Sequence, residues 1–323
     1  MDRREAVLAL VAIGAAAVSP CAHAQPVRRI GMLQPNAAFP ILEDAFRKRL
    51  AALGWVEGKN LVIESRHADN RNERMPALAA ELVALKVDVI VTNATPATLA
   101  AKAATSTIPI VFTLVSDPVG AGAVASLGRP GGNVTGIANL AGEIALKQLE
   151  LLKDLVPKLQ RVAFMRDPSI PGPRTMTKGL QSAAERAGLA LVIIDAQTAE
   201  EIEPAFATAV RERVTAMIMA PTSMYASQAT RIAELARKYR IATAFQTRRS
   251  VAAGGLVSYG ADGIDGFSRT AVYVDKILRG AKPGDLPVEQ ADRFVTIINK
   301  STAKALGITI PQSVLVRVDE VIE

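Results

Sequence analysis

One strand-helix-strand unit decides the fold class, and it occupies residues 87–115, VDVIVTNATPATLAAKAATSTIPIVFTLV. Its first segment, Asp88–Thr92, is a short β-branched run, and a second such run covers Ile108–Val115. Between them an alanine-rich stretch with helical spacing opens near Thr95. This order predicts parallel strands joined by a crossover helix, because a right-handed crossover places the helix over the sheet.

The same alternation extends in both directions along the chain. The other expected strands are Arg28–Leu33, Asn60–Ser65, Arg161–Met165, Leu189–Ile194, Val214–Ala220, Ile241–Phe245, Leu256–Gly260 and Arg293–Ile298. The expected helices are Phe39–Leu53, Glu73–Leu85, Ile264–Leu278 and a short helix that ends at Gly307. Strands that alternate with helices predict an α/β protein whose doubly wound parallel sheets carry helices on both faces.

The second half of the chain repeats the first. Residues 51–64, AALGWVEGKNLVIE, are echoed by residues 184–195, AERAGLALVIID, and each segment is a helix end, a glycine stop and a strand. A chain of 323 residues, 50% of them hydrophobic, can build two cores of ordinary size. We therefore expect two lobes, with the tail completing one or both sheets and the repeated crossings forming a hinge.

The N-terminus has the layout of a secretory signal peptide. Paired arginines, Arg3–Arg4, precede the uncharged run Ala6–Val18, which is too short to span a membrane. The small residues around Ala24 predict cleavage there, so residues 1–24 are the expected signal and the mature protein is periplasmic or otherwise extracytoplasmic. A lipid anchor on Cys21 is the alternative, and the export route, Sec or twin-arginine, stays open.

Composition excludes several functions. The net charge of +7 is diffuse and aromatic residues make up 4% of the chain, so no nucleic-acid partner is expected. Removal of the signal leaves no cysteine and one histidine, His67. Disulfides, thiol nucleophiles and Cys/His zinc sites are thereby excluded, and a Ser-His-Asp triad would depend on His67. We expect neither a metal nor a cofactor.

The candidate site lies in the loops beyond the carboxyl ends of the strands, where open parallel sheets bind ligands. Thr95 at an N-cap and Pro96 at the first helical position predict a helix whose free N–H groups can hold a carboxylate. A helix cap that binds nothing is the alternative. The candidate ligand-binding residues are Gln34, Asn36, Thr95, Pro96, Ala97, Thr98, Ser116, Asp117, Asp167, Thr222, Ser223, Gln246, Thr247 and Tyr259.

Two other patterns bear on enzyme activity. Residues 120–125, GAGAVA, match a dinucleotide fingerprint weakly, and we interpret them as a helix turn of small residues. Residues 128–133, GRPGGN, lack the lysine of a nucleotide-binding loop and predict a turn into the first crossing between lobes. Asp117 and Asp262 could serve a hydrolase as acid and base, although an aspartate before a helix is more often a cap.

Several segments together resemble the substrate-binding proteins of ABC importers, in particular relatives of the tryptophan- and phenylalanine-binding type. These segments are RIGMLQ (29–34), TPA (95–97), PIVF (109–112), SDPVGAG (116–122), RPGGNVTG (129–136) and GGLVSYG (254–260). The resemblance implies the type I periplasmic-binding fold, with two lobes that close on a ligand by hinge motion. Lobe one would comprise residues 26–137 and 258–290, and lobe two residues 138–257 and 291–323.

The same resemblance implies a function and assigns residues to it. Residues 95–98 and 116–117 would line the first half of the site, and Asp167, Thr222 and Ser223 the second. A monomer would capture a small carboxylate-bearing solute, an amino acid or another organic acid, without catalysis, and deliver it to a membrane permease. A ligand-sensing module for a receptor is a rival with the same fold.

The chain departs from this family at one place. After the strand that ends at Phe245, many relatives carry acidic residues suited to an amino group, whereas this chain has QTRR at 246–249. This difference argues against an α-amino acid as the ligand. Arg248, if it faced the cleft, would favour a carboxylate- or phosphate-bearing solute.

Overall fold

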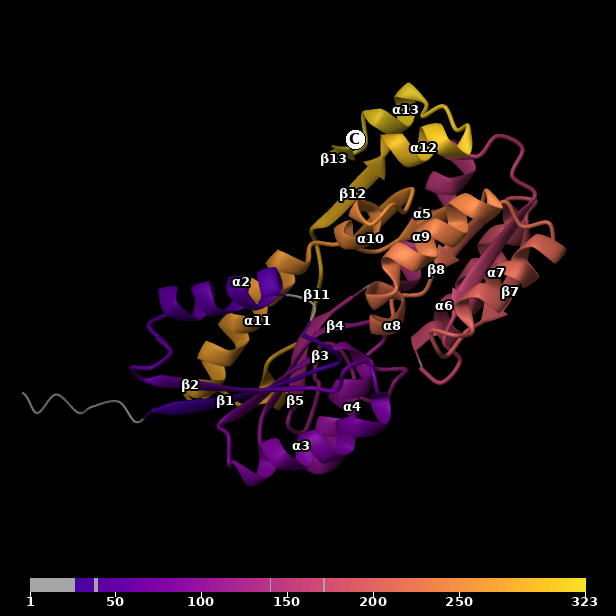
Figure 1. Ribbon diagram of the computed structural model, residues 1–323. Coiled ribbons are helices and arrows are strands. Elements are labelled where there is room, and N and C mark those ends of the chain that lie inside the picture. Colours follow the sequence, from indigo (N-terminus) through magenta and orange to yellow (C-terminus); the bar gives the residue numbers. More distant parts are fainter. Residues whose placement is uncertain (1–26, 38–39, 140, 171) are drawn as a thin grey trace, which may run out of the picture.

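The computed structural model describes residues 27–37, 40–139, 141–170 and 172–323, and they form two lobes (Figure 1). In this part of the chain the strands form one sheet of six and one of seven strands. The predicted signal peptide and Cys21 lie outside the described residues. Within the described ranges, no helix is long and apolar enough to cross a membrane.

The first sheet is entirely parallel, with the strand order β11-β5-β4-β3-β1-β2. Its strands are β1 (Arg28–Gln34), β2 (Leu61–His67), β3 (Val89–Asn93), β4 (Ile110–Val115), β5 (Val134–Ala138) and β11 (Glu289–Gln290). Its helices are α2 (Pro40–Ala52), α3 (Met75–Ala84), α4 (Ala94–Ala104) and α11 (Gly263–Leu278), with short 3-10 turns at Asn72–Arg74 and Pro283–Asp285.

Helices cover both faces of this sheet, which explains why β3 is apolar along most of its length. Val89 and Val91 belong to a buried cluster with residues of α2 and α11. Ile90, on the opposite face, belongs to a second cluster with residues of α3 and α4. Successive side chains of a strand point to opposite faces, so a strand buried on both sides requires apolar residues at consecutive positions.

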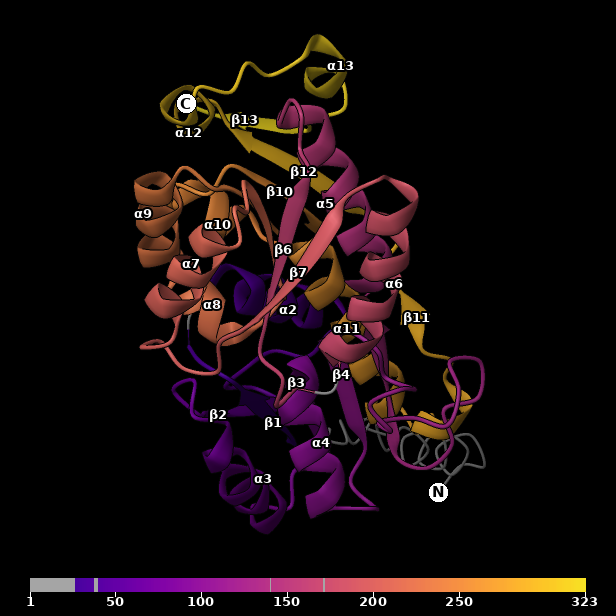
Figure 2. The ribbon, with the colours of Figure 1, turned by 90° about the vertical axis from the view of Figure 1, so that its right-hand side faces the viewer.

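The second sheet has the order β13-β12-β10-β9-β8-β6-β7. Its strands are β6 (Arg161–Arg166), β7 (Ala190–Asp195), β8 (Ala216–Met219), β9 (Ala242–Phe245), β10 (Val257–Ala261), β12 (Phe294–Asn299) and β13 (Glu320–Ile322). Its helices are α5 (Ala141–Leu155), α6 (Gly172–Arg186), α7 (Ile202–Arg211), α8 (Ser223–Ser227), α9 (Ala229–Tyr239), α10 (Arg248–Ala252), α12 (Lys300–Leu306) and α13 (Gln312–Leu315). Figure 2 shows α5 and α6 on one side of the strands and α7 and α9 on the other.

One pair in the second sheet departs from the expected parallel arrangement, because β10 and β12 are antiparallel. The chain leaves the second sheet after β10, forms α11 and β11 on the first lobe, and returns through β12. A strand that re-enters a sheet after such an excursion can run in either direction. The expected lobe boundary at residue 258 cuts through β10, whose paired residues all lie in the second sheet.

One local prediction was wrong. The segment 128–133 does not lead directly into the crossing, because strand β5 intervenes at Val134–Ala138. Gly136 allows this strand to lie close to β4, since a Cβ atom there would be 2.1 Å from the carbonyl oxygen of Phe112. Residues 120–122 belong to a single helix-like turn, closed by a hydrogen bond from Ala121 N to Asp117 O at 2.9 Å, and residues 123–125 do not continue it as a helix.

Candidate functional site

A pocket lies between the lobes, at the carboxyl ends of strands from both sheets. The pocket is partly open to solvent. The lining residues from lobe one are Pro35, Asn70, Asn72, Ala94, Thr95, Pro96, Leu114 and Ser116. The lining residues from lobe two are Ile170, Pro221, Thr222, Ser223 and Met224. A lining of apolar groups with a few polar ones is typical of small-molecule sites.

Five of the sequence-predicted residues line this pocket. They are Thr95, Pro96, Ser116, Thr222 and Ser223. The segments that carry them come directly after β3, β4 and β8, and Thr222 also caps α8 by accepting a hydrogen bond from Tyr225 N at 3.1 Å. Neighbouring parallel strands end at one edge of a sheet, and the two edges face each other across the pocket.

Helix α4 begins two residues earlier than the predicted cap at Thr95 and first helical residue at Pro96 imply. Its N-cap is Asn93, which makes no side-chain cap hydrogen bond, so the prediction of Thr95 as the cap was wrong. Ala94 adopts a φ of +68°, which turns the chain from strand to helix without a connecting loop. Thr95 and Pro96 therefore lie in the first helical turn, and the Thr95 side chain is buried against the pocket.

Other predicted residues of lobe one support the site without lining it. Ala97 belongs to the buried core. The Thr98 hydroxyl bonds to Thr92 Oγ1 at 2.7 Å. Asn36 donates to Asn70 Oδ1 at 2.6 Å, and Asn70 lines the pocket.

Two further lobe-one candidates, Gln34 and Asp117, are occupied by local contacts. Gln34 is buried at the end of β1 and donates to Glu43 Oε1 at 2.9 Å. Asp117 Oδ1 accepts a hydrogen bond from Gly120 N at 2.8 Å and closes a turn. Neither residue is among those that line the pocket.

Sequence reasoning missed the loop after β2 and the apolar part of the pocket. Asn70 and Asn72 follow β2 at the same sheet edge as the predicted loops, so the rule that found those loops could have found this one. Ile170 and Met224 come from lobe two. Their sequence positions carry no signal, because an apolar side chain in a loop does not reveal what it faces.

Asp167 differs from the other candidate residues because it is both charged and buried. Among the described residues it is the only acidic or basic residue in the buried set, with 4% of its surface exposed. Its Oδ1 accepts hydrogen bonds from Ser169 N at 2.9 Å and Ser169 Oγ at 2.6 Å. Burial, together with the charge of Asp167, raises the pKa of Tyr225 above its usual range. Outside residues 171–175, none of the ion pairs found involves Asp167.

The segment after β9 contributes none of the residues found to line the pocket. Arg248 pairs with Glu320 at 2.8 Å on the exposed surface of lobe two. Gln246 accepts a hydrogen bond from Asn139 Nδ2 at 3.0 Å, and Thr247 bonds to Ser250 at 3.0 Å. Arg248, which argued for a ligand other than an amino acid, is therefore paired with a surface carboxylate.

Tyr259, the last predicted residue, lies in β10. Its ring stacks on Phe294 with a centroid separation of 5.6 Å, and Phe294 begins the neighbouring strand β12. Tyr259 is not among the residues that line the pocket. Tyr259 packs instead against the buried core of lobe two.

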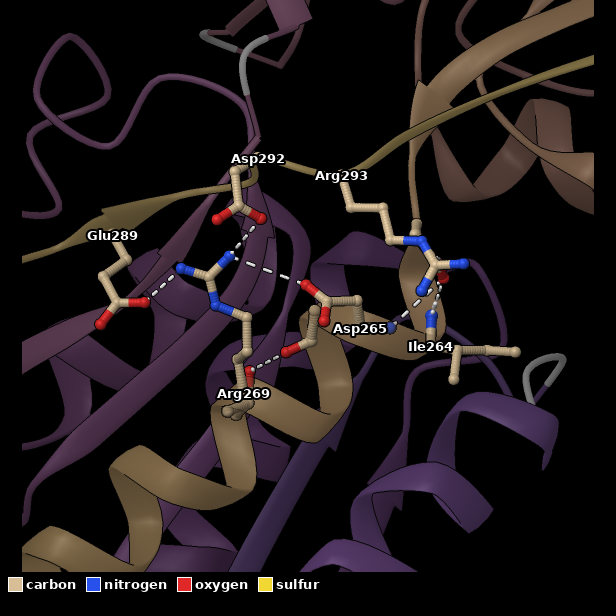
Figure 3. A network of polar contacts seen from close by, with 9 residues as sticks. Ile264, Asp265, Arg269, Glu289, Asp292 and Arg293 are labelled. Atoms are coloured by element: carbon tan, nitrogen blue, oxygen red, sulfur yellow. Dashed lines mark hydrogen bonds and ion pairs between the residues drawn. The ribbon is translucent and has the colours of Figure 1, made fainter. Parts of the chain in front are cut away.

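Ionic contacts hold the segments that cross between the lobes (Figure 3). Arg269 of α11 forms ion pairs with one residue of its own helix, one of β11 and one of the last crossing segment. These partners are Asp265, Glu289 and Asp292. Arg293 pairs with Asp262 at 3.2 Å, and Asp262 N donates to Arg293 O at 2.9 Å. Two of the crossings are thus joined side by side.

Comparison with known proteins agrees with this architecture. The family model described as ABC transporter substrate binding protein matches residues 38–322. The chain belongs to this family. A tyrosine-binding protein of Clostridioides difficile is 29% identical to this binding protein over 277 residues, which are 86% of this chain and 79% of the relative.

Two solved structures of similar sequence identity differ in how closely their overall structures match that of this chain. A Streptococcus pneumoniae ABC domain in complex with L-Trp is 28% identical, covers 91% of this chain and 99% of its own, and has a TM-score of 0.85. A ligand-free, open substrate-binding protein with adhesive properties from Clostridium difficile is also 28% identical, with coverages of 92% and 99%, but has a TM-score of 0.68.

Proposed function

We propose that this protein is the extracytoplasmic solute-binding component of an ABC importer and that its ligand is an α-amino acid. One observation carries the proposal: a single pocket is lined by residues of both lobes. A ligand that contacts both lobes at once stabilises their closed arrangement, because only such contacts differ between open and closed forms.

The first turn of α4 is suited to the ligand carboxylate. Helix N-termini carry free N–H groups and a partial positive charge, and the Asn93 side chain leaves those of α4 uncapped. The hydroxyls of Thr95 and Ser116 line the pocket beside this turn. We infer that these groups bind the carboxylate from the lobe-one side.

Asp167 is suited to the ligand ammonium group. A buried carboxylate is costly unless it is paired, and outside residues 171–175 the hydrogen bonds found to Asp167 come from Ser169 and no ion pair is found. The loop of Asp167 reaches the pocket through Ile170, whose N donates to Asp167 O at 3.3 Å. A ligand ammonium would complete the pair from the lobe-two side.

The remaining lining favours an apolar side chain. Leu114, Ile170, Pro221 and Met224 contribute apolar surface to the pocket. The relatives named for tyrosine binding or solved with L-Trp support an amino acid of this kind. The pairing of Arg248 with Glu320 removes the reason to prefer a phosphate-bearing solute.

We infer that the described arrangement is the closed one. At equal identity, the TM-score with the L-Trp complex exceeds that with the ligand-free, open relative. The mature monomer, released by cleavage near Ala24, would deliver the ligand to a membrane permease. No catalytic role follows for Asp262 or Asp117, because each carboxylate is engaged by neighbouring backbone N–H groups.

A thermal-shift panel tests the ligand class. Protein expressed from Gln25 onward is incubated with the common L-amino acids and, for each amino acid that binds, with its decarboxylated amine and its deaminated acid. We expect apolar or aromatic amino acids to raise the melting temperature in proportion to the logarithm of concentration above the Kd. Neither analogue should match its parent, because each lacks one of the two charged groups.

Two results would count against the proposal. If no amino acid shifts the melting temperature, the ligand belongs to another class. If a deaminated acid binds as tightly as its parent, Asp167 does not pair with an ammonium group. Isothermal titration of the best ligand then provides the Kd used in the variants below.

A further inference from the structure

Backbone strain is concentrated at one edge of the pocket. Among the described residues, eight other than glycine have a φ between +51° and +68°. Four of these end or follow helices, where a left-handed residue is a common way to stop a helix: Lys86, Lys158, Arg213 and Arg240. The other four follow or lie in strands β2, β3 and β4 of lobe one: Asp69, Asn70, Ala94 and Leu114.

Three residues of the second group line the pocket: Asn70, Ala94 and Leu114. Asparagine adopts the left-handed region readily, because its short side chain can hydrogen-bond locally. Alanine and leucine do not, since their Cβ atoms crowd the carbonyl oxygen, and glycine would avoid this cost. Such outliers persist only where the surrounding structure holds them, and they cluster at ligand sites.

Each strained residue orients a candidate ligand group. Ala94, with a φ of +68°, connects the last residue of β3 to the first turn of α4, and Thr95 follows it directly. Leu114, with a φ of +59°, lies where the register of β4 against β5 shifts, and Ser116 follows two residues later. A bulge of this kind changes the direction in which the following side chains point.

Packing fixes Leu114 in this conformation. Its side chain packs against the cluster that contains α2 and α11. A Cβ atom at Gly266 of α11 would lie 3.8 Å from Leu114 Cδ2, so the leucine fits against that glycine. The hydrogen bond from Asn139 N to Val115 O, at 2.8 Å, holds the strand immediately beyond.

We propose that Ala94 and Leu114 are positioning residues, whose left-handed backbones hold Thr95 and Ser116 in the binding arrangement before the ligand arrives. The proposal rests on the proposed function. A residue with a Cβ atom has only a small left-handed region available, whereas glycine has a wide one. A site with glycine at these positions would have to be ordered by the ligand, which lowers the affinity.

The variant Ala94→Gly tests this idea, and Lys86→Gly is its matched control. Lys86 has a φ of +51°, precedes the same strand β3 and is exposed away from the pocket. Both variants relieve a left-handed Cβ, so we expect neither to lower the melting temperature. Only Ala94→Gly should weaken binding of the best amino acid, by about twofold to fivefold, the range expected for glycine against alanine.

Hydrogen exchange provides a readout that needs no ligand. In the ligand-free protein, the amides of Thr95 and Ala97 should exchange faster in Ala94→Gly than in the wild type or in Lys86→Gly. Unchanged exchange in Ala94→Gly would overturn the proposal, whatever the ligand proves to be. An affinity equal to or higher than that of Lys86→Gly would also overturn it.

Leu114 requires a comparison of two variants, because its side chain also packs. Leu114→Ala and Leu114→Gly both remove the isobutyl group, and only the second releases the backbone. We expect Leu114→Gly to bind about twofold to fivefold more weakly than Leu114→Ala. Equal affinities would remove Leu114 from the proposal. Absence of amino-acid binding by the wild type would contradict the proposed function itself and leave the exchange experiment to decide the positioning role.

Discussion

Sheet topology places some residues of the candidate site, whereas Asp167 is distinguished by its burial. Thr95 and Ser116 follow strands of lobe one, so the topology of a parallel sheet brings them to one edge. Ile170 and Met224 face them from lobe two. Asp167 is set apart by its burial, because a buried carboxylate for which no ion pair is found outside residues 171–175 is unusual.

The variant Asp167→Asn tests the ammonium contact. It keeps the size of the side chain and removes the charge, so we expect the affinity for an amino acid to fall by at least about tenfold, since a hydrogen bond to a charged group is worth about 1.5–3 kcal/mol. Isothermal titration measures the loss. The control is Asp195→Asn at the end of the adjacent strand β7, where the carboxylate pairs with Arg166 at 2.8 Å. An equal effect of both variants would refute a specific role of Asp167.

Among the elements, α11 shows how distant segments build one lobe. It comes after the whole second half of the chain's strand-helix alternation, yet Phe267 and Val274 join the same buried cluster as Phe46 of α2. Figure 1 shows the two helices side by side on the first sheet. Asp262 starts α11 by accepting hydrogen bonds from Ile264 N at 2.9 Å and Asp265 N at 3.3 Å.

We expect Asp262→Ala to destabilise the protein by about 1 kcal/mol, because it removes the N-cap of α11. Urea unfolding followed by circular dichroism measures the change. Asp44→Ala is the control, since Asp44 is an exposed acid of α2 that pairs only with Lys48 at 2.8 Å among the contacts found. A loss no greater than that of the control would mean that the cap contributes nothing.

At the scale of the whole molecule, the crossings between lobes determine how the cleft opens. The chain crosses after β5, after β10 and after β11, and the last two crossings share the network of Figure 3. Burial alone would raise the pKa of Glu289, but the hydrogen bond from Arg269 and the positive charge of Arg269 outweigh it. The pKa of Glu289 therefore lies below its ordinary value of 4.5.

This shift predicts a pH-dependent contribution to stability. A carboxyl group with a lowered pKa in the folded state stabilises the protein above its unfolded pKa, and this contribution is lost as the pH falls through the folded value. Wild type should thus melt at a higher temperature than Glu289→Gln at pH 7, and the gap should close as the pH falls below about 4.5. In an Arg269→Met background, Glu289→Gln should cost less than in the wild type. A gap independent of pH would contradict the ionic explanation.

The fold was predictable because its signals are local. The β-branched run of β3, buried along its whole length, and the amphipathic spacing of α11 depend only on neighbouring residues. The predicted strands and helices therefore match those of the structure within a few residues, apart from the missed elements such as β5. Where a chain segment returns to a sheet is a long-range choice, and this explains why the prediction divided β10 between the lobes.

The sequence by itself determined the strand-helix alternation, the two sheets and the loops at their carboxyl ends, because periodicity and crossover handedness act locally. Only the tertiary structure decided which side chains of those loops share the pocket. Asn70 and Met224 line it while Thr98 faces the core, since a loop's direction depends on packing against distant elements. The left-handed conformations of Ala94 and Leu114 were also decided by the tertiary structure, because the surrounding packing imposes them against local preference.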